Sequence, residues 1–202
     1  MANTQAQFGF KHIGYLSGGA PDYQQSTRGI VKTLATAIGF GDPVERTNAT
    51  SAYIVRGTAG TTATSAPIEG ILAGTQFTPT GGIPAWSPFW PGNTVSADAT
   101  AYIIDAPNAL FLCATLLTAI VTSNIGNVVN YTTGTPSTVG QGYSIATIDQ
   151  ATATTTGTTT SFLPFKIVSL YQGIGNGSDS TSNYNWVVVT FNNQVYRNLS
   201  GF

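Results

Sequence analysis

Nine short runs with high strand propensity recur along the sequence, and their spacing restricts the fold more than any other feature. The runs are rich in valine, isoleucine, tyrosine, phenylalanine and threonine, and turn-forming residues bound each of them. They are Arg28–Lys32, Ala52–Arg56, Ile68–Phe77, Thr100–Asp105, Leu110–Thr115, Val128–Tyr131, Gly142–Thr147, Leu163–Leu170 and Asn185–Phe191. This pattern predicts an all-β protein, either a jelly-roll-like sandwich or a barrel.

The last two runs predict a hairpin, because a segment of turn-forming residues, QGIGNGSDSTSN, separates them. Alternate residues from Trp186 to Phe191 point to opposite faces, and both sets are largely apolar. We therefore expect this strand to be buried on both sides. Helical structure is expected only as short turns within Thr118–Asn127 and Leu34–Ile38.

Charged residues make up 7% of the chain, against roughly 25% in ordinary globular proteins. Seven basic and eight acidic residues leave no basic footprint for nucleic acid, so we expect no nucleic-acid partner. Polarity comes mainly from hydroxyl and amide side chains, including 32 threonines. A net charge of −1 protects poorly against self-association, which indicates that partners cover much of the surface. The alternative is a threonine-rich β-protein whose uncharged surface stays free.

Few residues are available for catalysis or metal binding. His12 is the single histidine and Cys113 the single cysteine, which excludes an intramolecular disulfide and any cluster of several such ligands. The nucleophile elbow G-x-S-x-G, the Walker loop and G-x-G-x-x-G are absent. Asp98 and Asp105 lie nearest to an aromatic loop, so a glycoside hydrolase with paired carboxylates stays a remote alternative. We expect no enzymatic activity, no catalytic residue, no cofactor and no bound metal.

No membrane segment is expected. Polar residues follow Met1 without the apolar core of a signal peptide, which predicts use without secretion. The longest apolar stretch, Leu110–Val121, has 12 residues and contains threonines, so it is too short to span a bilayer.

Two segments have a biased composition. Residues 175–180, GNGSDS, resemble a fragment of a calcium-binding nonapeptide repeat, but their place between two strands favours a hairpin turn. Residues 151–160, ATATTTGTTT, hold seven threonines and form either a flexible linker or an extended excursion between strands. Threonine is β-branched and tolerates extended backbone, which favours the excursion.

An uncharged loop at residues 83–92, IPAWSPFWPG, carries two tryptophans, a phenylalanine and three prolines. It fits a protein interface, a lid over the core, or a sugar-binding platform. Tryptophan is enriched at interface hot spots, and the prolines lower the entropy cost of ordering the loop on binding. We expect Trp86 and Trp90 to divide these roles, with one ring in the core and the other at a contact with a neighbour.

Several short motifs follow one another in a set order. FGFKHIGYLSGGAP opens the chain, and the sequence ends with LPFKIVSLYQGIGN and NWVVVTFNNQVYRN. Between them lie FGDPV (40–44), IEGILAGTQFTP (68–79), SPFWPGNT (87–94), AYIIDAPNALFLCAT (101–115) and VGQGYSIATID (139–149). This succession resembles the head cement, or decoration, proteins of tailed bacteriophages, over nearly the whole chain. The family resemblance also implies an acidic turn at Asp105–Pro107 and a terminal strand at Asn192–Arg197.

The resemblance implies a structural virion protein on the outer surface of the phage capsid head, made in the host cytoplasm. It implies binding to the major capsid protein, cementing of neighbouring copies, and a symmetric homo-oligomer, with a trimer favoured over a dimer. The alternative function is a carbohydrate-binding or adhesion module displayed on the virion.

The expected organisation is an N-terminal extended arm, residues 1–27, followed by a single β domain, residues 28–202. The arm is expected to reach a neighbouring subunit or the capsid instead of folding into its own core, because its apolar triplet FGF stands in a sequence rich in Gly, Gln and Ser. The candidate interface residues are aromatic side chains of the arm and of the 83–92 loop: Phe8, Phe10, Trp86, Phe89 and Trp90.

Overall fold

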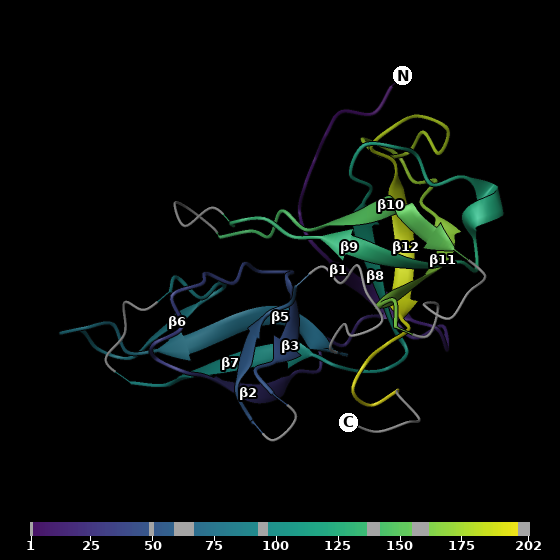
Figure 1. Cartoon of the computed structure of the whole chain (residues 1–202). Helices are drawn as coiled ribbons and strands as arrows, with labels where there is room; N and C mark the ends of the chain where they lie inside the picture. Colours follow the sequence, from purple (N-terminus) through teal and green to yellow (C-terminus); the bar gives the residue numbers. More distant parts are fainter. Residues whose placement is uncertain are drawn as a thin grey trace.

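The computed structural model describes residues 2–48, 51–58, 67–92, 97–136, 142–154 and 162–197. Within these residues the chain is an all-β sandwich of two antiparallel sheets, which confirms the predicted fold class (Figure 1). The single helical segment among the described residues is η1 (Thr122–Asn124), inside the range where a helical turn was predicted.

Sheet A, at the upper right of Figure 1, has six strands and carries the predicted C-terminal hairpin. Its order is β1 (Lys11–Tyr15), β8 (Ala109–Ala114), β12 (Trp186–Phe191), β11 (Phe165–Leu170), β9 (Val128–Thr132) and β10 (Thr147–Thr154). Sheet B is built around the ten-residue strand β5. Its order is β2 (Ser26–Ile30), β7 (Ala99–Ile104), β5 (Ile68–Phe77), β3 (Pro43–Arg46) and β4 (Ile54–Arg56), and β6 (Ala85–Ser87) also pairs with β5.

Several predicted elements differ from the observed ones. Gly142–Thr147 is mostly loop, with a single bridge from Tyr143 to Phe40, and only its last residue begins β10. Leu34–Ile38 is not helical, because Ile38 instead pairs with Trp90. Asn192–Arg197 is not a strand; it forms a turn with one bridge, between Gln194 and Ile68. Of the threonine-rich segment, residues 151–154 extend β10, and residues 155–160 lie outside the described residues.

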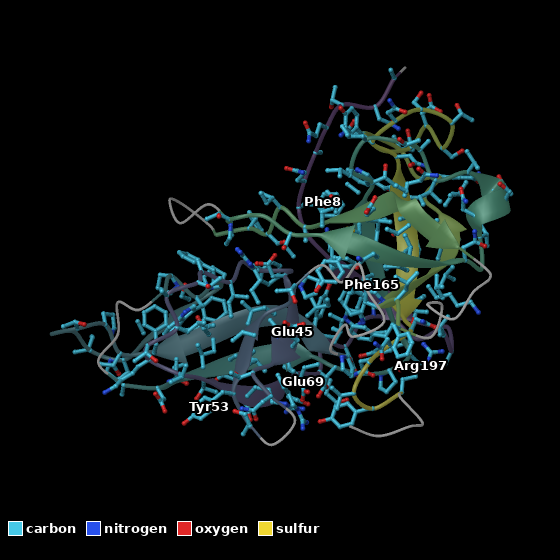
Figure 2. The ribbon with its side chains drawn as sticks, viewed as in Figure 1. Phe8, Glu45, Tyr53, Glu69, Phe165 and Arg197 are labelled. Atoms are coloured by element: carbon cyan, nitrogen blue, oxygen red, sulfur yellow. The ribbon has the colours of Figure 1, made fainter. Side chains whose placement is uncertain are left out.

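The main core lies between the two sheets. Ile68, Ile71 and Ile104 of sheet B meet a group of aromatic and aliphatic side chains from sheet A. Figure 2 shows Phe165 at this junction, where its ring stacks on Phe10 at a centroid distance of 4.4 Å. Burial of these apolar side chains is the main force that holds the sheets together.

A second core covers the other face of sheet B. Strand alternation sends Leu72 to this face while its neighbours Ile71 and Ala73 join the main core. This core is closed by Trp90 together with the loop that joins β2 to β3. The backbones of Ile38, in that loop, and Trp90 exchange hydrogen bonds of 3.0 and 2.9 Å. Sheet B is therefore covered on both faces, although it is antiparallel.

Part of the predicted N-terminal arm belongs to the fold. Lys11–Tyr15 forms β1, which pairs with β8, and Phe10 is 2% exposed within the main core. The expectation that residues 1–27 form an arm outside the fold is therefore wrong for Phe10 and β1, and also for Ser26 and Thr27, which begin β2. The reason is that Phe10 fills the space between Phe165, Phe111 and Tyr131.

The first residues of the arm are held by the loop between β11 and β12. The Asn176 amide accepts a hydrogen bond from the Thr4 backbone N–H (2.9 Å) and donates one to the Thr4 carbonyl (3.0 Å). Asn3 donates to the Asp179 carbonyl at 2.7 Å. The GNGSDS segment is thus part of a hairpin loop, as predicted. It also holds the N-terminal segment of the same chain through these hydrogen bonds.

Candidate interaction surfaces

The structure separates the five predicted interface residues. Phe10 and Trp90 are buried in the two cores, which corrects their assignment to an interface. Phe8 is partly buried, edge-on to Trp186 at a centroid distance of 4.9 Å, and Figure 2 shows it on the N-terminal segment beside sheet A. Phe89 is partly buried, and Trp86 is exposed. Trp86 is the member of the set that is best placed to contact a partner.

Trp90 acts as a lid on the second core. Its side chain is 0% exposed, its indole N–H donates to the Leu34 carbonyl at 3.1 Å, and its ring meets Phe77 edge-on. The apolar ring gains from burial while its one polar group is satisfied. The lid interpretation of the 83–92 loop therefore holds for Trp90.

Trp86 stands on the outside of sheet B as a flat platform. It lies on β6 opposite Gln76, and a Cβ built on Gly74 of β5 would lie 2.8 Å from its ring. The indole therefore lies against the glycine, and the residue is still 63% exposed. Glycine inside a strand is a signal for such a close approach, and Gly74 gave that signal in the sequence.

The same hairpin carries a second exposed apolar side chain. Ile83 lies in the β5–β6 connection and is 81% exposed. We call the surface of Ile83 and Trp86 the hairpin patch. Its position is at the left-hand end of the molecule in Figure 1, where β6 is labelled.

A second exposed apolar group surrounds η1. Leu117, Val121 and Ile125 are exposed at 57%, 44% and 42%, and we call them the η1 patch. In Figure 1 this short helix is at the opposite end of the molecule from β6. The sequence does not distinguish the η1 patch, because its residues continue an apolar stretch that also supplies buried residues such as Ile120.

The three ion pairs among the described residues all belong to one network, which is centred on Glu69. Its carboxylate is 0% exposed and accepts from Arg28 at 2.5 Å and from Arg46 at 2.7 Å. Arg28 also pairs with Asp105 at 3.2 Å, and Gln194 donates to the backbone carbonyl of Asp105 at 2.8 Å. Two positive and two negative charges balance here. The network connects strands of sheet B, and the hydrogen bond from Gln194 links it to the C-terminal segment.

Asp42 links two of the motifs that suggested the family. Its carboxylate accepts from the Gly39 N–H at 2.6 Å and from the Ser144 hydroxyl. Burial raises the pKa of the Asp42 carboxyl and that of Glu45, which accepts from Thr58 at 3.1 Å. These buried carboxyls tie loops together and do not face a described cavity.

Asp98 and Asp105, the pair considered for glycoside hydrolysis, engage different structural partners. Asp98 accepts from the Tyr53 hydroxyl at 2.6 Å and from the Lys32 N–H at 3.0 Å. The Tyr53 hydrogen bond lowers the pKa of Asp98. A general acid of a glycosidase needs a raised pKa, so Asp98 does not suit that role.

Within the described ranges, no group of three or more His, Cys, Asp and Glu side chains is placed to hold a metal ion. Cys113 is buried, and burial raises the pKa of its thiol. None of the described helical segments has the length and apolar character that crossing a membrane requires. Comparisons of the chain with protein-family models, curated proteins and solved structures find no match.

Proposed function

We propose that this chain is a structural, non-enzymatic protein that binds the outside of a phage capsid head and cements neighbouring copies of the major capsid protein. The observation that carries the proposal is the pair of exposed apolar patches at opposite ends of the molecule. A protein that binds a different shell subunit with each end connects the two subunits. The order of the sequence motifs supports the same role.

The placement of charge supports binding through apolar contacts. The ion pairs of the described residues are gathered in the network around Glu69, whereas the hairpin and η1 patches consist of uncharged side chains. Contacts of this kind depend little on salt, because screening acts on exposed charges. A protein that holds a shell together in variable ionic conditions benefits from such contacts.

The proposed partners are the major capsid protein and further copies of this chain, with a trimer favoured over a dimer. Several weak contacts made by one oligomer combine into tight binding, because each contact after the first forms at high effective concentration. The proposed location is the outer surface of the capsid head. The alternative function is a carbohydrate-binding or adhesion module displayed on the virion surface.

The test is rebinding of purified protein to capsids from which it has been stripped, measured by co-sedimentation. Trp86→Ala is expected to weaken binding about thirtyfold, and Trp86→Phe, which keeps a flat ring, to weaken it much less. Leu117→Ala tests the other end in the same way. The proposal fails if the wild-type protein does not rebind, or if both alanine variants bind as well as the wild type.

A further inference from the structure

The loop between β11 and β12 contains the one Asn-Gly pair of the sequence, Asn176 and Gly177. Asparagine is among the residues that degrade chemically in proteins. It reacts most readily before glycine, because glycine has no Cβ to keep the next backbone nitrogen away from the side-chain amide. Gly175 and Gly177 have positive φ angles of +114° and +81°, which shape the turn around Asn176. The turn that holds the N-terminal segment thus contains a chemically reactive amide.

The side-chain amide of Asn176 is bonded to Thr4 through both of its polar atoms. Its Oδ1 accepts from the Thr4 backbone N–H at 2.9 Å and from the Thr4 hydroxyl at 3.2 Å. Its Nδ2 donates to the Thr4 carbonyl at 3.0 Å. One residue of the N-terminal segment therefore fixes the orientation of this amide.

The backbone nitrogen of Gly177, the group that attacks such an amide, is bonded to the same segment. Its N–H donates to the Asn3 Oδ1 at 3.1 Å, and the Asp179 N–H donates to that oxygen at 3.3 Å. Asn3 also donates to the Asp179 carbonyl at 2.7 Å. We call the hydrogen bonds of Asn3 and Thr4 with this loop the N-terminal contact. While this contact is formed, the amide of Asn176 and the nitrogen that attacks it are held in separate hydrogen bonds.

Gly177 also packs against the ring that contacts the next part of the N-terminal segment. A Cβ built on Gly177 would overlap the Trp186 indole, so the glycine lies directly against that ring. Trp186 in turn meets Phe8 edge-on at a centroid distance of 4.9 Å. In Figure 1 the N-terminal segment runs from sheet A toward this loop at the top of the view. A change in the backbone at Gly177 therefore affects the N-terminal segment at two places.

Deamidation of Asn176 requires only these groups and water. The Gly177 nitrogen forms a bond to Asn176 Cγ and gives up its proton, which leaves with the side-chain amino group as ammonia. Water then adds to one of the two carbonyls of the resulting cyclic imide and opens the ring. The product at this position is an aspartate or an isoaspartate. Because the ammonia is lost, the change is permanent.

Either product is incompatible with the N-terminal contact. At neutral pH an aspartate has a carboxylate oxygen in place of the Nδ2 that donates to the Thr4 carbonyl, and two acceptors form no hydrogen bond. An isoaspartate also lengthens the backbone by one methylene group, which shifts Gly177 relative to Trp186. Phe10, which is buried in the main core, marks the point at which the chain stays anchored.

We propose that Asn176 is a site of spontaneous deamidation that the N-terminal contact protects, and that its reaction permanently releases residues 2–9 from the loop. The reaction proceeds when the contact opens, because local opening of the fold exposes groups that the closed state protects. The site is a one-way conformational switch: the closed contact slows the reaction, and the reaction prevents the contact from closing again. This inference concerns the chain alone and does not rest on the proposed capsid role.

The first test incubates the protein at mildly alkaline pH and follows Asn176 by peptide mass spectrometry, with isoaspartyl methyltransferase labelling to detect isoaspartate. Asn3→Ala removes the hydrogen bonds of Asn3 and frees the Gly177 nitrogen. It is therefore expected to speed the conversion of Asn176 about tenfold over the wild type. Asn176→Gln is the control, because the longer side chain cyclises far more slowly, and it is expected to show no conversion. The proposal is overturned if Asn3→Ala converts no faster than the wild type.

The second test uses Asn176→Asp, which reproduces one product. Chymotrypsin is expected to cleave after Phe8 about tenfold faster in this variant than in the wild type, because the segment is released. Asn108→Asp adds the same charge at an exposed residue between β7 and β8 and is expected to leave cleavage unchanged. A melting curve shows whether each variant is folded, and either test decides the proposal if the other variant does not fold. Unchanged cleavage in a folded Asn176→Asp variant would overturn it. Capsid rebinding is a separate assay, so either proposal can fail without the other.

Discussion

Trp86 and Trp90 lie four residues apart in the same loop, yet Trp90 is 0% exposed and Trp86 is 63% exposed. Trp90 closes the second core of sheet B, whereas Trp86 lies against Gly74 and leaves much of its surface to solvent. The two rings therefore contribute to different properties of the protein. Trp90 holds the fold, and Trp86 is available for contacts.

Alanine substitutions at the two tryptophans are expected to have different effects on stability. Trp90→Ala leaves a large void and an unpaired Leu34 carbonyl, so it is expected to lower the free energy of unfolding by about 3–5 kcal/mol. Trp86→Ala removes a mostly exposed ring and is expected to cost less than about 1 kcal/mol. Urea denaturation of both variants checks this. Equal losses would show that Trp86 also belongs to the core.

Gly74→Ala tests how Trp86 is positioned. The added methyl group would lie 2.8 Å from the indole, so the ring must move off the sheet. We expect weaker capsid binding with little loss of stability, measured by co-sedimentation and by urea denaturation. The double variant Gly74→Ala, Trp86→Ala is expected to bind no worse than Trp86→Ala alone. Additive losses would mean that Gly74 acts through another contact.

Glu69→Gln tests the buried ion network. The substitution removes the buried negative charge that balances Arg46 and that, together with Asp105, balances Arg28. Breaking a buried pair in this way is expected to cost about 3–5 kcal/mol of stability. The control is Asp149→Asn, whose side chain accepts a local hydrogen bond from Ala151 and should change stability little. A loss of stability below about 1 kcal/mol for Glu69→Gln would show that the ion network contributes little to the stability of the fold.

Asp42 is expected to tolerate the loss of its charge but not of its oxygens. Burial raises its pKa, so the folded protein favours the neutral form, and the stability contribution is present below the unfolded pKa and lost as pH rises through the folded pKa. Asp42→Asn keeps an acceptor for the Gly39 N–H, and the Ser144 hydroxyl can reorient. Asp42→Ala leaves both donors unpaired and should cost about 1–3 kcal/mol at pH 7. If Asn and Ala cost the same in urea denaturation, the hydrogen bonds are not what matters.

The single histidine gives a direct check by NMR. Burial lowers the pKa of His12 below 6.5 despite the Gly14 carbonyl and the negative charge of Asp22. The folded state therefore binds fewer protons than the unfolded state, so stability is fully present above about pH 6.5 and decreases as pH falls through the folded pKa. Titration of the His12 ring signals should give a midpoint below 6.5. A midpoint above 6.5 would show that the folded state binds the proton more tightly than the unfolded state, against the expected effect of burial.

The sequence predicted the longest strand well, but it missed β10 (Thr147–Thr154) apart from its first residue and missed several strands that depend on pairing. β5 occupies its predicted residues, Ile68–Phe77, because apolar residues bounded by turns identify it. β1 was missed, since Lys11–Tyr15 contains two polar residues and a glycine and becomes a strand through its pairing with β8. β3 and β6 were missed because they are short and become strands by pairing with β5.

The candidate surfaces show the same limit. The local sequence identifies the aromatic loop. It does not indicate which tryptophan is exposed, because the burial of each ring depends on the distant residues that pack over it. Phe10 looked like part of an arm because its neighbours are small and polar, yet it fills a space formed by residues far away in the sequence.

The most direct test of the central claim is an electron cryomicroscopy reconstruction of capsids decorated with this protein. The account predicts density for the chain on the outer capsid surface, with the hairpin patch on one capsid subunit and the η1 patch on a neighbouring subunit or a second copy of the chain. Capsids that show no such density, or a bound chain with Ile83, Trp86 and Leu117 all facing solvent, would contradict it.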